Sequence, residues 1–286
     1  MPPQIWSLLV RRSSSQDRKM VKLTPEQIQF WKENGYIKLS GIFTDEELDT
    51  LSKEYNRLFF LKNNPGMEAA QLGSAMTKTT SGENYSVHSV HNLQYHSSIF
   101  ANALHNENLL EAVKGVMGTE DILLHHTKAH YKPPRVGAPY LMHQDYHYFP
   151  FKKHSMVAAF IHIDKADPEN GGLCIYPGSH KLGPLEDVGA IEKGDRHHYV
   201  DPKKYTIEKA TPVIAERGEV VIFSYLTVHG SYRNLSDRPR RMYLIQLMSA
   251  HDEPLVPDLH KSLGQGWVLR GKNDYKKADL AERFLH

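Results

Sequence analysis

The apolar and polar positions divide the chain into a first part that predicts helices and a second part, from Ile122 onward, that predicts short strands. Thr24 with Gln27 and Thr44 with Glu47 have the spacing of capping boxes, which mark helix starts. The expected early elements are helices over residues 24–34, 45–58 and 106–116 and a short strand over residues 36–39.

The second part consists of short runs of strand-forming residues separated by turn residues. In residues 241–248 the even-numbered and the odd-numbered positions are both largely apolar, as in a strand that is covered on both faces. We therefore expect a mainly β fold with flanking helices (α+β), whose core is a β-sandwich or jelly roll. The expected strands cover residues 122–131, 156–163, 173–176, 219–223 and 241–248.

No linker is evident, so residues 23–286 are expected to form a single domain with a helical N-terminal part and a β core. Residues 1–22, rich in arginine and serine, are expected to be a disordered start or a short targeting leader. With 40% hydrophobic residues, 24% charged residues and a net charge of +2, the composition is that of a globular protein and does not indicate nucleic-acid binding.

The longest apolar runs, such as residues 156–163, are too short to span a membrane. Cys174 is the only cysteine, which excludes an intramolecular disulfide and favours an intracellular location, with cytoplasm, peroxisome and mitochondrion left open. No feature of the sequence predicts the oligomeric state.

Eighteen histidines raise the question whether some of them form a metal site. A His-x-Asp or His-x-Glu sequence on a strand places both side chains on one face, and a distant histidine then completes the facial triad of non-haem Fe(II) oxygenases. The pattern occurs four times, at His105/Glu107, His143/Asp145, His162/Asp164 and His251/Glu253.

Context favours the second of these pairs. The first pair precedes the β region at a helix start and the fourth follows the last expected strand, so both are expected at the surface. The third pair is more simply the end of an apolar strand. His143 and Asp145 lie in an aromatic-rich stretch, residues 140–150, whose side chains are able to line a cavity.

A third metal ligand and an anion-binding residue are available downstream. His229 follows an expected strand, 86 residues after His143, a gap that can hold several strands. Arg240 begins another strand, where its guanidinium could bind a carboxylate in a bidentate manner beside a metal. Arg238 and Arg241 are alternatives for this role, and all three arginines could instead belong to a solvated turn.

Several motifs of the chain resemble the phytanoyl-CoA dioxygenase family. They are residues 143–151 (HQDYHYFPF), 170–173 (NGGL), 177–180 (PGSH), 229–231 (HGS) through Asn234 to Arg240, and the helical start 29–36 (QFWKENGY), and the resemblance covers residues 23–250.

The resemblance implies a double-stranded β-helix (jelly-roll, cupin-like) core, with Fe(II) bound by His143, Asp145 and His229. It also implies 2-oxoglutarate bound by Arg240 with assistance from Ser231, O2 as the other cosubstrate, and ascorbate as a supporting reductant. Three further residues fall where relatives have residues near 2-oxoglutarate: Phe160 at a common tryptophan position, His126 at a glutamine or histidine position, and His91 near a basic residue.

The implied reaction is hydroxylation of a small organic molecule, and we favour 2-hydroxylation of a fatty acyl-CoA such as phytanoyl-CoA. Aromatic residues 146–151 could hold an alkyl chain, and Lys152 and Lys153 could meet CoA phosphates. The alternatives are the same reaction on a smaller or more polar metabolite, a zinc or other divalent-metal cupin-like protein, and a non-catalytic metal-binding jelly-roll module.

Overall fold

The computed structural model describes residues 21–60, 69–72, 87–189, 198–257 and 259–273. Its helices are α1 (Pro25–Asn34), α2 (Asp45–Phe60), α3 (Ser98–Leu104) and α4 (Glu107–Met117). Its strands are β1 (Tyr36–Leu39), β2 (Ala69–Leu72), β3 (Val87–His91), β4 (Ile122–Lys132), β5 (Tyr140–His143), β6 (Val157–His162), β7 (Leu173–Ile175), β8 (Thr211–Pro212), β9 (Val220–Ser224), β10 (His229–Ser231), β11 (Arg240–Ser249) and β12 (Val268–Arg270).

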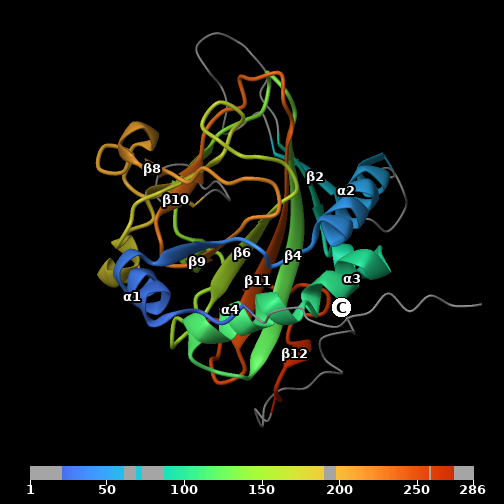
Figure 1. The fold of residues 1–286 in the computed structure, drawn as a ribbon. Helices are drawn as coiled ribbons and strands as arrows, with labels where there is room; N and C mark the ends of the chain where they lie inside the picture. The colour runs from blue at the N-terminus through green and yellow to red at the C-terminus, as the bar shows by residue number, and fades with distance from the viewer. Residues whose placement is uncertain (1–20, 61–68, 73–86, 190–197, 258, 274–286) are drawn as a thin grey trace, which may run out of the picture.

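Two antiparallel sheets form the β core (Figure 1). The larger sheet has the strand order β1-β9-β6-β11-β4-β3-β2, with β12 paired to β4, and the smaller sheet has the order β5-β10-β7-β8. Helices α2, α3 and α4 lie along one side of the large sheet, and β8 and β10 lie on the other side (Figure 1). This arrangement confirms the expected mainly β fold with flanking helices and a jelly-roll core.

Strand β11 shows how the sequence pattern produces these layers. Tyr243, Ile245 and Leu247 belong to the apolar cluster that the large sheet shares with the helices. Met242 and Leu244, on the opposite face, belong to a second cluster between the two sheets. Because side chains alternate along a strand, a run that is apolar at every position can be covered on both faces at once.

The expected helices and strands are present, with ends shifted by a residue or two. The first capping box is formed as expected, since Thr24 accepts from the Gln27 amide while the Gln27 side chain accepts from the Thr24 amide. Gly35 ends α1 with a left-handed backbone, φ 75°, which glycine adopts without strain. The sequence patterns did not predict α3, the edge strand β2 and its neighbour β3, or the short strands β8, β10 and β12.

No helix in the described ranges is both long and apolar enough to cross a membrane, in agreement with the apolar runs of the sequence. The expectation of a leader or disordered start falls almost wholly outside the described residues, which begin at Val21.

Candidate active site

The three expected metal ligands lie together between the two sheets. His143 is the last residue of β5 and His229 is the first residue of β10, and the two residues face each other in the antiparallel pairing of these strands. Asp145 begins the short 3-10 helix Asp145–His147. The expected common strand face for His143 and Asp145 is therefore wrong in detail, because the strand ends at His143 and a tight turn presents Asp145 instead.

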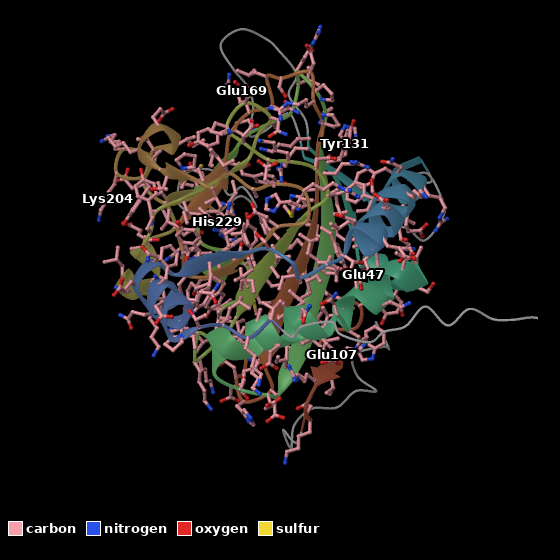
Figure 2. The ribbon with its side chains drawn as sticks, in the orientation of Figure 1. Glu47, Glu107, Tyr131, Glu169, Lys204 and His229 are labelled. Atoms are coloured by element: carbon pink, nitrogen blue, oxygen red, sulfur yellow. The ribbon has the colours of Figure 1, made fainter. Side chains whose placement is uncertain are left out.

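The donor atoms converge on one point. The Oδ1 atom of Asp145 lies 3.5 Å from Nε2 of His143 and 3.7 Å from Nε2 of His229, and the imidazole ring centroids are 4.2 Å apart. One nitrogen or oxygen from each side chain lies within 4.8 Å of the others. Two imidazoles and one carboxylate, grouped on one side of a cavity, are the donor set of a facial Fe(II) site. Figure 2 shows His229 inside the molecule, between the strands.

Backbone carbonyls set the orientation of both imidazoles. Nδ1 of His143 lies 2.7 Å from the Leu141 carbonyl oxygen, and Nδ1 of His229 lies 2.9 Å from the Thr227 carbonyl oxygen. In the tautomer that lets each Nδ1–H donate to its carbonyl, both Nε2 lone pairs face the carboxylate. This is the outer hydrogen bonding that metal-ligating histidines usually have.

Electrostatics keep His229 and Asp145 in the states that bind a metal. Burial lowers the pKa of His229 to about 4, so its imidazole is neutral at pH 7. Burial alone would raise the pKa of Asp145, but His229, His143 and a hydrogen bond from Gln246 outweigh it, so the pKa is lowered and the carboxylate stays ionised. A neutral imidazole and an ionised carboxylate are the ligand forms.

The turn between the ligands is held by Gln144, which is fully buried. Its Nε2 donates to the carbonyl oxygens of Leu226 (2.6 Å) and Gly183 (3.0 Å), and its Oε1 accepts from the amide of Leu185 (2.8 Å). One side chain thus satisfies three backbone groups from two other segments and fixes the turn that presents Asp145.

The remaining His-x-acid pairs do not form metal sites with the described residues. His162 is buried, with Nδ1 3.1 Å from the Glu219 carbonyl oxygen, and its neighbour Asp164 pairs with Arg241. The other two pairs lie at or near the surface, as expected: His105 and Glu107 are exposed, and His251 and Glu253 pair with Asp121 and Lys152.

Two buried basic side chains, Arg240 and Lys132, lie next to each other, and Arg240 lines the same cavity. Arg240, 3% exposed, stands opposite Lys132 in the pairing of β11 with β4. Nζ of Lys132 donates to Oγ of Ser231 and to the Tyr232 carbonyl oxygen, both at 2.6 Å. The Arg240 guanidinium lines the cavity, and its Nε has no hydrogen-bond partner among the described residues. Burial lowers the pKa of both cations.

Two adjacent buried cations without a hydrogen-bonded carboxylate are costly unless an anion binds between them. Ser231 was expected to assist Arg240 in binding 2-oxoglutarate. In the structure the Ser231 hydroxyl accepts a hydrogen bond from Lys132, and Ser231 lines the same cavity as Arg240.

The two alternative arginines have other partners. Arg238 is bound to Asp167 at the surface. The guanidinium of Arg241 makes two hydrogen bonds to Asp164 (2.9 and 2.7 Å) and also donates to Ser52 of α2. Neither side chain lines the cavity, so the structure brings only Arg240 of the three to the site.

Replacing Arg241 with alanine is expected to lower the free energy of unfolding by about 1–3 kcal/mol, because it leaves the partly buried Asp164 unpaired. The apparent Michaelis constant for 2-oxoglutarate should stay unchanged. Urea unfolding and initial-rate kinetics check this, and an unchanged stability with a raised 2-oxoglutarate constant would contradict the assignment.

The other expected site residues also line this cavity of about 350 Å³. Phe160 packs edge-on against Phe223, with ring centroids 4.8 Å apart. His126 pairs with Gln246, six positions along β11 from Arg240, which places it towards the opposite end from the buried cations. His91 ends β3 opposite Lys128 of β4.

Several lining residues escaped the sequence reasoning. The signal was the alternation of basic residues along β4, where His126, Lys128, His130 and Lys132 recur at every second position and so share one strand face. The sequence next to His91 contains no lysine or arginine. Lys128, which pairs with His91 across the sheet, supplies a basic side chain there. The remaining missed lining residues include Tyr140, His198, Gln246 and His260.

A jelly roll that holds two histidines, one carboxylate and a buried arginine in one cavity defines the class of Fe(II)- and 2-oxoglutarate-dependent oxygenases. Residues 31–242 match the phytanoyl-CoA dioxygenase (PhyH) family, and the chain belongs to this family. The class of enzyme and the cofactors expected from the sequence, Fe(II), 2-oxoglutarate and O2, are confirmed.

The chain is similar to relatives with different substrates. It is 30% identical over 227 residues to the peroxisomal phytanoyl-CoA dioxygenase of Bos taurus, covering 77% of this chain and 66% of the relative, or about two thirds of its length. It is 27% identical over 243 residues to a probable alpha-ketoglutarate-dependent hypophosphite dioxygenase of Stutzerimonas stutzeri, covering 81% and 80%.

Among solved structures, the epimerase SnoN in complex with Fe3+, alpha ketoglutarate and nogalamycin RO has a similar fold. Its TM-score is 0.65 at 18% identity, over 87% of this chain and 96% of that one.

Proposed function

We propose that this chain binds Fe(II) through His143, Asp145 and His229, anchors 2-oxoglutarate on Arg240, and hydroxylates a small organic molecule. The observation that carries the proposal is the buried guanidinium of Arg240, whose Nε has no hydrogen-bond partner in the part of the chain that the structure describes and which lines the same cavity as the proposed metal ligands. A dianionic cosubstrate that reaches from a metal to this guanidinium would neutralise the buried cations.

Bound Fe(II) would supply the oxidation chemistry, in which oxidative decarboxylation of 2-oxoglutarate to succinate is coupled to hydroxylation of a carbon–hydrogen bond. The protein's own residues position the reactants. The Leu141 and Thr227 carbonyl oxygens orient the imidazoles, Gln246 holds Asp145, and Lys132 holds the Ser231 hydroxyl beside Arg240. Tyr148, Phe149 and Phe160 cover the cavity with apolar surface that limits access of water.

For the substrate we propose a fatty acyl-CoA that is hydroxylated at carbon 2. The similarity to mammalian phytanoyl-CoA dioxygenases and the apolar lining from Phe149, Leu173 and Leu244 support an alkyl chain near the metal ligands. The sequence suggested that Lys152 could contact the CoA phosphates. Its support for an acyl-CoA substrate is weaker in the structure, because Lys152 pairs with Glu253 and does not line the cavity.

A smaller anionic metabolite is the second candidate. At about 350 Å³ the cavity is near the lower limit for ligand pockets, so with 2-oxoglutarate inside it leaves little room for a substrate. Lys128 adds a basic side chain to its wall, and the chain aligns with 80% of the length of the relative named a probable hypophosphite dioxygenase. Both features favour a compact anion.

Succinate release across a substrate panel is the test. Straight- and branched-chain acyl-CoAs of several lengths are expected to stimulate succinate formation and to yield a product heavier by one oxygen in mass spectra. Stimulation by small carboxylates or phosphorus oxyanions alone would replace acyl-CoA by the second candidate. If 2-oxoglutarate is not consumed in the presence of Fe(II), ascorbate and any of these compounds, the proposed oxygenase reaction is wrong.

A further inference from the structure

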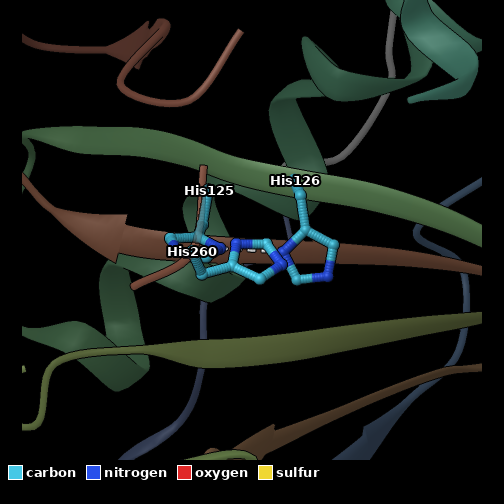
Figure 3. Close-up of side chains that lie close together, drawn as sticks. All are labelled: His125, His126 and His260. Carbon is cyan, nitrogen blue, oxygen red and sulfur yellow. Dashed lines mark hydrogen bonds between the residues drawn. The ribbon is translucent and has the colours of Figure 1, made fainter. Parts of the chain in front are cut away.

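Three histidines outside the proposed iron ligands form a second cluster (Figure 3). His125 and His126 come from β4, and His260 comes from the segment between β11 and β12. The three ring centroids form a nearly equilateral triangle with sides of 5.0, 5.1 and 5.2 Å. One ring nitrogen of each histidine lies within 4.8 Å of the other two. Imidazoles from distant segments thus converge on one place.

An irregularity in the sheet makes this convergence possible. Gln246 pairs with His126 but Leu247 pairs with Leu124, so His125 is an additional residue in β4, as in a β-bulge. Neighbouring residues on a regular strand point to opposite faces. Here, both His125 and His126 contact Phe149 and His260. The bulge therefore turns two consecutive histidines towards the same place.

The cluster is buried and incompletely hydrogen-bonded. His125 is 0% and His126 is 8% exposed, and their Nδ1 atoms lie 2.8 Å apart. Nε2 of His125 and Nδ1 of His260 have no hydrogen-bond partner among the described residues. Burial lowers the pKa of each of the three imidazoles, so all are neutral at pH 7 and carry a lone pair. Buried polar atoms without a partner call for a ligand or an ordered water.

From this geometry we infer that His125, His126 and His260 form a second metal site, which takes a late first-row divalent ion such as Zn²⁺. Neutral imidazoles suit Zn²⁺, Cu²⁺ and Ni²⁺, and a set of three histidines leaves one position of tetrahedral Zn²⁺ open. Nitrogens bound to one Zn²⁺ lie about 3.4 Å apart. The half-buried His260 can supply the small movement required, because it lies outside the regular strands.

The three-histidine cluster borders the cavity of the proposed iron site. His126 and His260 both line that cavity, and Phe149 lies against all three rings, with centroid distances of 4.8, 5.6 and 5.4 Å. Gln246 connects the two groups, since it pairs with His126 in the sheet and donates to Asp145 at 3.3 Å. The two metals would therefore share one cavity without sharing a ligand.

Zinc stoichiometry tests the site in the purified 286-residue chain, by equilibrium dialysis with Zn²⁺ followed by mass-spectrometric metal analysis. Zn²⁺ also suits two histidines and a carboxylate, so the wild-type chain is expected to bind two ions. Asp145→Ala and His260→Phe should each retain one ion, and the double variant none. His260→Phe preserves the ring contact with Phe149 and should weaken the second site at least about 100-fold.

Thermal unfolding separates loss of the site from loss of the fold. In the Asp145→Ala background, added Zn²⁺ should raise the unfolding temperature, and His260→Phe should remove this increase without lowering the metal-free value. His251→Ala, which removes an exposed histidine bound to Asp121, is the control and should change neither. The inference is overturned if Asp145→Ala binds no Zn²⁺, or if His260→Phe in that background still binds it as tightly.

Discussion

Replacing Asp145 with alanine is expected to abolish 2-oxoglutarate-dependent succinate formation and Fe(II) binding. Asp145 is the only anionic donor of the proposed triad, and one of its oxygens lies 3.5 and 3.7 Å from the two histidine nitrogens. Removing a ligand should cost more than the roughly 10- to 100-fold that loss of an outer hydrogen-bonding partner costs. Iron analysis after dialysis and succinate release at saturating 2-oxoglutarate measure the two effects.

Glu107→Ala is the matched control, because Glu107 also stands two residues after a histidine but lies on the outer helix α4 (Figure 2). It should retain wild-type iron content and turnover. The unfolding temperature of metal-free Asp145→Ala should stay close to that of the metal-free wild type. Wild-type iron affinity in the alanine variant would show that the ligand assignment is wrong.

Replacing Arg240 with alanine is expected to raise the apparent Michaelis constant for 2-oxoglutarate by about ten- to a hundredfold. A charge-assisted bidentate hydrogen bond contributes about 1.5–3 kcal/mol, and each 1.4 kcal/mol corresponds to a factor of ten. Lys132 stays in place as a second buried cation, so binding should be weakened and turnover at saturating cosubstrate less affected. Initial rates over a range of 2-oxoglutarate concentrations separate the two parameters.

Arg240→Lys and Arg238→Ala complete this test. Lysine keeps the charge but not the planar fork, so an intermediate 2-oxoglutarate constant is expected. Arg238 is paired with Asp167 at the surface, and its removal should leave the constant unchanged. If Arg240→Ala left the Michaelis constant for 2-oxoglutarate unchanged and Arg238→Ala raised it, Arg238 would be the residue that binds 2-oxoglutarate.

Local chemistry made much of the fold predictable. A capping box such as Thr24 with Gln27 needs only four consecutive residues, and the structure contains it as expected. The strand over residues 36–39 and the five later strands have the expected positions to within a residue or two. Strands β2 and β3 escaped prediction because they depend on pairing partners: β3 is stabilised by its pairing with β4, which begins 31 residues after β3 ends.

The candidate site likewise has features that the sequence predicted and features that it could not predict. The spacing of His143 and Asp145, the downstream His229 and the family resemblance indicated the metal ligands from sequence alone. The spacing could not distinguish among Arg238, Arg240 and Arg241, because three nearby arginines of one segment differ only in the direction of their side chains. In the structure, salt bridges hold Arg238 and Arg241 outside the cavity.

The sequence by itself determined helices α1, α2 and α4, the main strands and the family, since these depend on residue type, short spacing and recognisable motifs. It also indicated the proposed donor set, which combines one short spacing with a distant histidine. Only the tertiary structure decided that Lys132 faces Arg240, that Lys128 lies beside His91, and that a bulge turns His125 and His126 to one side. These contacts depend on strand register, and a shift of one residue moves every side chain to the opposite face. Register is set by the packing of the complete sheets, which no short stretch of sequence contains.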